Sequence, residues 1–468
     1  MTYVNRLSEI IEQKKDKFIE VSDSIWNFAE TRFEEYQSAE LLCKTLESEG
    51  FSVEKGVGNI ETAFIGSFGT GKPIVAIMGE FDALSGMSQK AATAKQEPII
   101  QGENGHGCGH NLLGTGSLAA AVAVKDYMEE NHINGTVRYY GCPGEEGGSG
   151  KTFMVREGLF DDVDFAFCWH PLDVNGVMSM DSLSNFQVYY KFKGKSSHAA
   201  ASPHLGRSAL DAVELMNVGV NYLREHIIQE ARVHYAITNS GGLSPNVVQQ
   251  DAEVLYLLRA PEVSQVQDIY LRVCNIAKGA ALMTGTELEI VFDKACSNVI
   301  QNTVLDSVMY KNFQELGIPQ HDDDEKQLAK EIRATLTEQE RNSTINPFKD
   351  NQDDALANWL EPIEGIQAPL TGSSDVGDVS WIVPTAQCTT ACFVLGSPLH
   401  SWQWVTLGST SIAHKGMLHA GKVIAATAVE VLQNPELIEK AKTELKERLQ
   451  GKSYISPIPQ DVKPLVKR

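Results

Sequence analysis

Residues 136–171 read TVRYYGCPGEEGGSGKTFMVREGLFDDVDFAFCWHP, and the order of apolar and polar residues in this stretch indicates the fold. An apolar run at Thr136–Tyr140 is followed by a helix-length segment at Lys151–Glu157 and by a second apolar run at Asp164–Cys168. Two strands joined through a helix form a parallel pair, because the chain must cross over before it adds a strand in the same direction. The stretch therefore predicts an α/β domain.

The flanking sequence continues this pattern. Apolar runs at Glu61–Ile65 and Pro73–Met78 predict further strands, and the alanine-rich segment Leu112–Glu129 predicts a long helix. Asn5–Ala29 has the apolar spacing of one amphipathic helix. Strands separated by helices imply a mostly parallel sheet with helices on both faces.

The pattern changes between residues 184 and 298. In this part, strand and helix patterns follow one another as β-α-β-β-α-β, the order of a ferredoxin-like α+β sandwich. The expected elements are Phe186–Phe192, Leu205–Glu225, Val233–Thr238, Glu253–Leu258, Val263–Leu282 and Glu287–Phe292. We therefore expect a ferredoxin-like satellite domain at residues 184–298, inserted between two parts of a larger domain at residues 1–183 and 299–468.

Composition excludes several classes of protein. The 468 residues carry a formal net charge of -21, so phosphate-rich partners such as nucleic acids and anionic membranes would be repelled. No apolar run approaches the roughly 20 residues that span a bilayer. The eight cysteines are scattered rather than densely spaced, which favours a reduced, cytoplasmic protein.

The segment Gly105–Asn111, GHGCGHN, contains two residues that can ligate a metal, Cys108 and His110. The glycines allow the backbone to bend around an ion. A glycine-rich turn before the next helix would have the same pattern, because one Cys-x-His pair is a weak motif.

Two adjacent carboxylates, Glu145 and Glu146, follow the apolar run at Thr136–Tyr140. Side chains alternate in extended backbone, so one carboxylate could ligate a metal while the other acts as a general base. An acidic surface turn is the alternative. His170 and Asp82 also follow apolar runs, and ligands collect at the carboxyl ends of parallel strands. Together these positions indicate one site.

The order of motifs resembles a known superfamily. Asp-Ala-Leu at 82–84 is followed by His-x-Cys-Gly-His, Glu-Glu-Gly-Gly, Trp-His-Pro, Ser-His-Ala-Ala and Gly-Gly-x-x-Pro-Asn, the last ending at Asn246. This series is similar to the aminoacylase and carboxypeptidase G superfamily of dinuclear metallopeptidases. It most resembles the amidohydrolase branch of plant indole-acetyl-amino-acid hydrolases and bacterial hippurate hydrolases.

The resemblance implies a metal-dependent amidohydrolase with two divalent ions, Zn or Mn, per chain. It implies five metal ligands, without deciding which ion each one binds: Cys108 as the bridge, His110, Glu146, His170 and His400. Glu145 would be the general base, and Asp82 would orient a ligand. Glu80 would stand beside the site without binding a metal.

The resemblance also assigns residues of the expected satellite domain. His198 would reach across a dimer to polarise the scissile carbonyl, while Asn246 and Arg259 would recognise a substrate carboxylate. The expected substrate is an N-acyl or N-aroyl amino acid, such as p-aminobenzoyl-glutamate, or a dipeptide. A dipeptidase or aminopeptidase of the same superfamily, and a non-catalytic partner subunit, are the alternatives. The chain would form a homodimer or larger homo-oligomer, or pair with a related second subunit. The insertion Ser85–Gly105 could shape the acyl pocket or form a lid.

Overall fold

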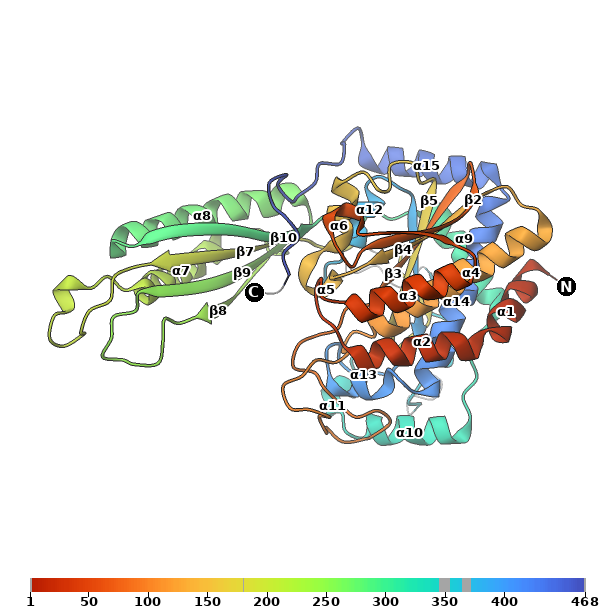
Figure 1. Cartoon of the computed structure of the whole chain (residues 1–468), viewed down its shortest axis with the longest axis horizontal. Helices are drawn as coiled ribbons and strands as arrows, with labels where there is room; N and C mark the ends of the chain where they lie inside the picture. Colours follow the sequence, from red (N-terminus) through yellow and green to blue (C-terminus); the bar gives the residue numbers. More distant parts are fainter. Residues whose placement is uncertain (1, 180, 345–353, 364–371, 467–468) are drawn as a thin grey trace.

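The computed structural model describes residues 2–179, 181–344, 354–363 and 372–466. Two lobes are visible in Figure 1: a large lobe built on a seven-stranded sheet and a slender lobe built on a four-stranded sheet. The large sheet has the order β1-β2-β4-β3-β5-β11-β6. Its strands are β1 Ser52–Lys55, β2 Phe64–Thr70, β3 Ile74–Glu80, β4 Gly135–Cys142, β5 Phe165–Leu172, β6 Gly176–Val177 and β11 Thr385–Ala391.

The four central strands of the large sheet, β4, β3, β5 and β11, run parallel to one another. The outer strands pair antiparallel: β1 with β2, β2 with β4, and β6 with β11. The connection from β1 to β2, residues 56–63, is too short for the helical crossover that a parallel pair requires. Every residue of β3 is buried, as expected for a central parallel strand. The prediction of an α/β fold with a largely parallel sheet is confirmed.

The helices of the large lobe are α1 Tyr3–Gln13, α2 Lys15–Phe28, α3 Tyr36–Ser48, α4 His110–Asn131, α5 Glu145–Gly148, α6 Gly150–Arg156, α9 Thr303–Leu316, α10 Asp323–Arg333, α11 Glu338–Arg341, α12 Val376–Ser380, α13 Trp402–Leu407, α14 Ser411–Leu432 and α15 Pro435–Leu449. Helices α4 and α14 pack against each other and against the central strands. None of the helices in the described part of the chain combines the length and apolar character needed to cross a membrane.

Two expected boundaries in the large lobe are wrong. The helix expected at Asn5–Ala29 is two helices, because Lys14 leaves helical geometry at φ -108° and ψ 7° and breaks the run. The strand expected at Glu61–Ile65 begins only at Phe64, since residues 61 and 62 form a turn.

The slender lobe comprises β7 Ser184–Lys193, α7 Ala209–Leu223, β8 Arg232–Asn239, β9 Asp251–Ala260, α8 Val263–Thr284 and β10 Glu287–Cys296. Its strands pair antiparallel in the order β10-β7-β9-β8. Helices α7 and α8 pack on one face of this sheet, where Phe186, Val188 and Tyr190 are buried.

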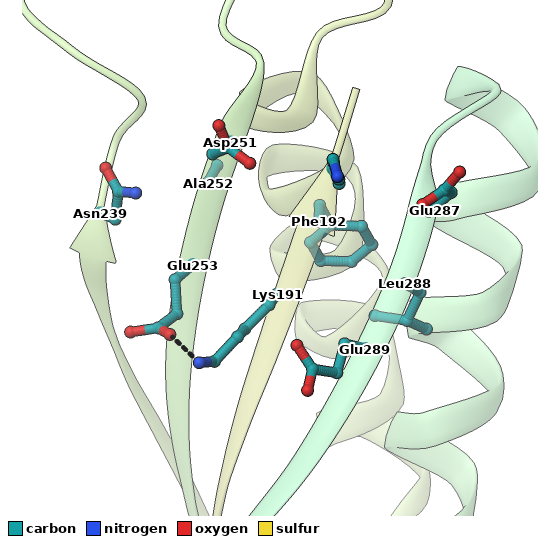
Figure 2. Close-up of a pocket in the computed structure, with 10 residues that line it drawn as sticks. Lys191, Phe192, Asn239, Asp251, Ala252, Glu253, Glu287, Leu288 and Glu289 are labelled. Carbon is teal, nitrogen blue, oxygen red and sulfur yellow. Dashed lines mark ion pairs between the residues drawn. The ribbon is translucent and has the colours of Figure 1, made fainter. Parts of the chain in front are cut away.

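The opposite face of the small sheet carries polar residues. At its outer end, rows of acidic and basic side chains line a shallow pocket, and Lys191 pairs with Glu253 at 3.3 Å (Figure 2). The strand β10 contains a bulge at Asp293, which lies between Phe292, the partner of Val188, and Lys294, the partner of Gln187. Because the bulge adds one residue to the strand, Lys294 faces the same side of the sheet as Gln187.

Candidate active site

A cavity of about 320 Å³ lies between the carboxyl end of the large sheet and the polar face of the small sheet. Both lobes contribute side chains to it. The large lobe supplies Glu80, Cys108, Glu145, Glu146, Trp169, His170 and His400, and the small sheet supplies Asn185, Gln187, Leu257, Arg259 and Lys294. Four of the five expected metal ligands therefore line one cavity. The fifth, His110, has a donor atom within 4.8 Å of those of Cys108 and His170.

Cys108 and His110 are presented by the turn that leads into α4. Gly109 between them has φ +75°, and a Cβ at this position would lie 2.9 Å from both Phe393 and Pro171. Only glycine fits such a backbone without strain. Burial, and then the charge of Glu146, raise the pKa of the Cys108 thiol, and a bound cation would favour its thiolate form.

His170 lies within β5 rather than after it, because the strand continues to Leu172. Its Nδ1 is 2.8 Å from the carbonyl oxygen of Pro171, and its Nε2 is 3.3 Å from Cys108 Sγ. Burial and the nearby His110 lower the pKa of His170 to about 4. The imidazole is therefore neutral near pH 7 and has a lone pair to offer a metal.

Glu145 and Glu146 do not extend a strand, as the sequence pattern had indicated, but form the first turn of the short helix α5. Their side chains still diverge. Glu146 Oε1 lies 3.1 Å from His400 Nε2. Burial alone would raise the pKa of Glu146, but the adjacent His400 imidazole and the charge of His110 lower it to about 2. This carboxylate is therefore ionised.

Glu145 has the opposite electrostatic environment. Burial, together with the negative charges of Glu80, Asp375 and Glu146, raises its pKa well above the usual range of a glutamate. A carboxyl group in this environment accepts a proton readily and can return it. The pKa values of Glu145 and Glu146 are thus shifted in opposite directions although the two residues are adjacent in the chain.

Asp82 contacts two of the expected metal ligands, His110 and Glu146. Its Oδ1 lies 2.9 Å from His110 Nδ1, and its Oδ2 accepts a hydrogen bond of 3.0 Å from the Glu146 backbone N–H. The contact to Nδ1 leaves Nε2 of His110 for another partner.

His400 adopts a left-handed backbone conformation with φ +59°, which is uncommon for residues other than glycine. Its N–H donates to the Gly107 carbonyl oxygen at 3.1 Å, so the strained residue is tied to the turn that carries Cys108. Strain of this kind is concentrated at functional sites.

The donor atoms are close enough to share metal ions. Cys108, His110 and His170 form one group, and Cys108, Glu146 and His400 form a second, each with its donor atoms within 4.8 Å of one another. Cys108 belongs to both of these groups, and Glu80, His110 and Glu145 form a third group by the same distance criterion. Nε2 of His110 and Oε1 of Glu146 are buried without a well-aligned hydrogen bond among the described residues. A cysteine, imidazoles and a carboxylate are types of ligand that bind Zn or Mn, so these residues are suited to hold such an ion.

Of the three residues expected to contact the substrate, one lines the cavity and two do not. Arg259 lines the cavity and donates to Ser373 Oγ at 2.8 Å. His198 and Asn246 are exposed and are absent from the cavity lining. They lie side by side, since the residue after His198, Ala199, donates its N–H to the Asn246 carbonyl oxygen at 2.9 Å. Neither His198 nor Asn246 belongs to any of the possible metal-binding groups of the described chain.

Comparisons with known proteins agree with this geometry. The model of the peptidase family M20/M25/M40 matches residues 76–459. The chain belongs to this family.

The relatives of this M20 chain are hydrolases. It is 52% identical to a subunit of the p-aminobenzoyl-glutamate hydrolase of Escherichia coli (strain K12), with 98% of each chain covered, in agreement with the resemblance of its motifs to the amidohydrolase branch. It is 27% identical to the Xaa-Arg dipeptidase of Mus musculus, with 96% of this chain and 94% of the relative covered. A dinuclear metal-binding peptidase of Bacillus subtilis shares the fold, with a TM-score of 0.56, 18% identity and coverage of 90% of this chain and 99% of the other. The chain is thus a metal-dependent amidohydrolase of the M20 family.

Sequence reasoning missed a buried ion network beneath the M20 site. The ammonium group of Lys151, which is 0% exposed, donates to Glu80 at 2.6 Å and to Asp375 at 2.7 Å. Glu80 also lies 3.2 Å from His110 Nε2. The sequence around Lys151 does not indicate this network, because Glu80 and Asp375 lie 71 and 224 positions away in the chain.

Replacing Lys151 with methionine should destabilise the protein strongly. The change removes the ammonium group that both buried carboxylates contact, which costs about 3–5 kcal/mol in the free energy of unfolding. Urea denaturation followed by circular dichroism measures the change. Lys44→Met, at an exposed i,i+4 pair with Glu40, is the matched control and should behave like the wild type. Equal stability of the Lys151→Met variant would contradict the importance of the network.

The insertion at residues 85–105 does not line the cavity. It packs beside α13 instead, where Ala92 and Thr93 donate backbone N–H groups to Thr406. Met87 lies against Gly107, since a Cβ on that glycine would lie 2.5 Å from the Met87 sulfur. The insertion therefore supports the turn that carries Cys108 in the described conformation.

Proposed function

We propose that this chain hydrolyses the amide bond of an N-aroyl amino acid, with p-aminobenzoyl-glutamate as the first candidate. The observation that carries the proposal is one cavity that combines two metal-donor groups sharing Cys108, a further carboxyl group with a raised pKa, Glu145, and a cation, Arg259. The 52% identity to a p-aminobenzoyl-glutamate hydrolase subunit supports this choice of substrate.

Each residue has a role in the proposed reaction. Cys108, His110, Glu146, His170 and His400 would hold two divalent ions, and Asp82 would orient His110. Bound metal ions would activate the attacking water and polarise the amide carbonyl. Glu145 takes the proton of the attacking water and delivers it to the departing nitrogen. The guanidinium of Arg259 receives the free carboxylate of the substrate, for which its fork of donors is suited.

The aroyl group has an apolar surface available in the same cavity. Trp169, Leu172, Met178, Val299 and Leu399 contribute to the lining. Such side chains bury an aromatic ring favourably. A dipeptide is the second candidate substrate, supported by the similarity to the Xaa-Arg dipeptidase.

We also propose that residues 184–298 form a ferredoxin-like satellite domain that mediates dimerisation, with residues 1–183 and 299–468 as the two parts of the catalytic domain. Large apolar side chains are exposed on this lobe, among them Leu215, Val218 and Tyr222 of α7 and Ile237 of β8. Exposed apolar surface of this kind marks protein interfaces. His198 and Asn246 would complete the site of the partner chain. An identical partner is the simpler assembly, and a related second subunit is the alternative. All eight cysteines are free thiols, which favours a cytoplasmic location.

The first experiment is hydrolysis of p-aminobenzoyl-glutamate by the purified chain alone, loaded with Mn or Zn. We expect release of glutamate that stops on chelation and returns when metal is added back, because the site needs its ions to activate water. Chromatography of the products and metal analysis of the protein measure both effects. Turnover that persists after complete removal of metal would contradict the proposal. Full metal loading without turnover of any N-aroyl amino acid would move the function to dipeptides or to a two-subunit enzyme.

A further inference from the structure

The cavity contains a second cation that the proposed reaction does not use. Lys294 lines the cavity, and the residue is 7% exposed. Its ammonium group donates to the backbone carbonyl oxygen of Glu146 at 3.0 Å. One carbonyl oxygen satisfies one of the three N–H donors that an ammonium group carries.

Among the described residues, no carboxylate oxygen lies within 4.0 Å of the Lys294 ammonium group or of the Arg259 guanidinium. By contrast, Lys151, which is 0% exposed, has two such partners; Lys294 is 7% exposed and Arg259 is half-buried. Buried cations are normally paired, because removing a charge from water is costly. Two cations without a carboxylate partner in one cavity therefore fit a ligand that brings two negative charges.

The sheet register places the two cations on the same face. Asn185 on β7 stands opposite Arg259 on β9, and Gln187 on β7 stands opposite Lys294 on β10. The two cations are thus separated by the strand β7 and by two residues along it, at roughly 12 Å between their backbones. Their long side chains can approach a small ligand from two sides. Oδ1 of the 4% exposed Asn185, between them, has no hydrogen-bond partner among the described residues.

We propose that Lys294 selects substrates whose leaving amino acid has an acidic side chain, by binding the side-chain carboxylate while Arg259 binds the α-carboxylate. This assignment rests on the proposed function and narrows it to N-acyl derivatives of glutamate or aspartate. Lys294 reaches this position because the bulge at Asp293 turns it toward the cavity, and the Gln187 side chain beside it is held by Asp293 at 2.8 Å.

The test compares p-aminobenzoyl-glutamate with p-aminobenzoyl-glutamine, which has the same shape and a neutral side chain. For the metal-loaded wild type, we expect kcat/KM to be about 10- to 100-fold higher for the glutamate compound, the range for a hydrogen bond to a charged group. In Lys294→Met, kcat/KM for the glutamate compound should fall by that factor, while the value for the glutamine compound should change little.

Two further variants separate recognition from folding. Lys294→Arg keeps a cation and should keep most of the preference for glutamate. Lys191→Met, at the outer end of the same sheet face (Figure 2), should leave both values unchanged. Metal content and thermal unfolding of each variant verify that the site is intact.

The outcomes are distinct. Equal turnover of both compounds by the wild type would overturn the role of Lys294 and leave the proposed function standing. A parallel loss for both compounds in Lys294→Met would also overturn it, since it would show that the lysine acts only through the Glu146 turn. If the wild type hydrolysed neither compound, the proposed function would fail, and this inference with it.

Discussion

Replacing Glu145 with glutamine is expected to lower kcat by roughly 10²- to 10⁴-fold, the usual contribution of a general acid–base group. Glutamine has the same shape but cannot take a proton from the attacking water. The five donor residues are unchanged, and Glu145 belongs to neither group that contains Cys108. Metal content should therefore stay at the wild-type level. Steady-state kinetics and metal analysis of the same sample measure the two quantities.

The control for this variant is Glu54→Gln, an exposed carboxylate on β1. It should match the wild type in turnover and metal content. A kcat near the wild-type value in the Glu145→Gln variant, with metal fully bound, would contradict the role of Glu145 as the general base. Loss of metal from that variant would show instead that Glu145 is a ligand.

Replacing His198 with alanine is expected to lower kcat by about 10²- to 10³-fold, the loss found when one donor to a developing oxyanion is removed. The residue is exposed and lies outside the cavity of its own chain. Its Nδ1 accepts backbone N–H groups from Ala200 and Ala201 at 3.2 and 3.1 Å, so Nε2 carries the hydrogen of the neutral ring and can donate it. The loss should appear in kcat without a loss of bound metal, because none of the donor groups is touched.

Mixing the two inactive variants tests whether His198 acts across a dimer. A mixed dimer of Glu145→Gln and His198→Ala chains has one site with both groups intact. Equal amounts, dissociated and reassociated at random, should regain roughly a quarter of wild-type activity, because half of the dimers are mixed and each has one intact site. No recovery from a mixture shown to contain mixed dimers would mean that His198 acts within its own chain or not at all.

The sequence predicted the part of the site that depends on strand ends. Asp82, Glu145 and His170 each follow or end a parallel strand, and parallel strands bring their carboxyl ends to one edge, so local patterns were enough to place them together. The role of Cys108 and the inclusion of His400 came from family resemblance, since neither spacing nor periodicity joins residues 108 and 400.

Contacts that depend on register or on distant segments were not predictable. Lys294 faces the cavity only because a single extra residue interrupts β10, and the alternation of side chains in the sequence gives no sign of a bulge. Lys151 meets Asp375 across 224 positions of the chain. The break at Lys14 was missed for a different reason: the apolar spacing continues across it, while the backbone does not.

The residues of the cavity come from two parts of the chain. The expected metal ligands and Glu145 belong to the large lobe, while Asn185, Arg259 and Lys294 belong to the small sheet. On the proposed assignments, the metal donors and the general base are therefore encoded outside the part of the gene for residues 184–298, whereas Arg259, Lys294 and also His198 are encoded within it. If Lys294 selects the leaving amino acid as proposed, substitutions at this position would change the substrate preference while the metal donors of the large lobe stay intact. A recombined insertion would carry its own substrate preference to a new host chain.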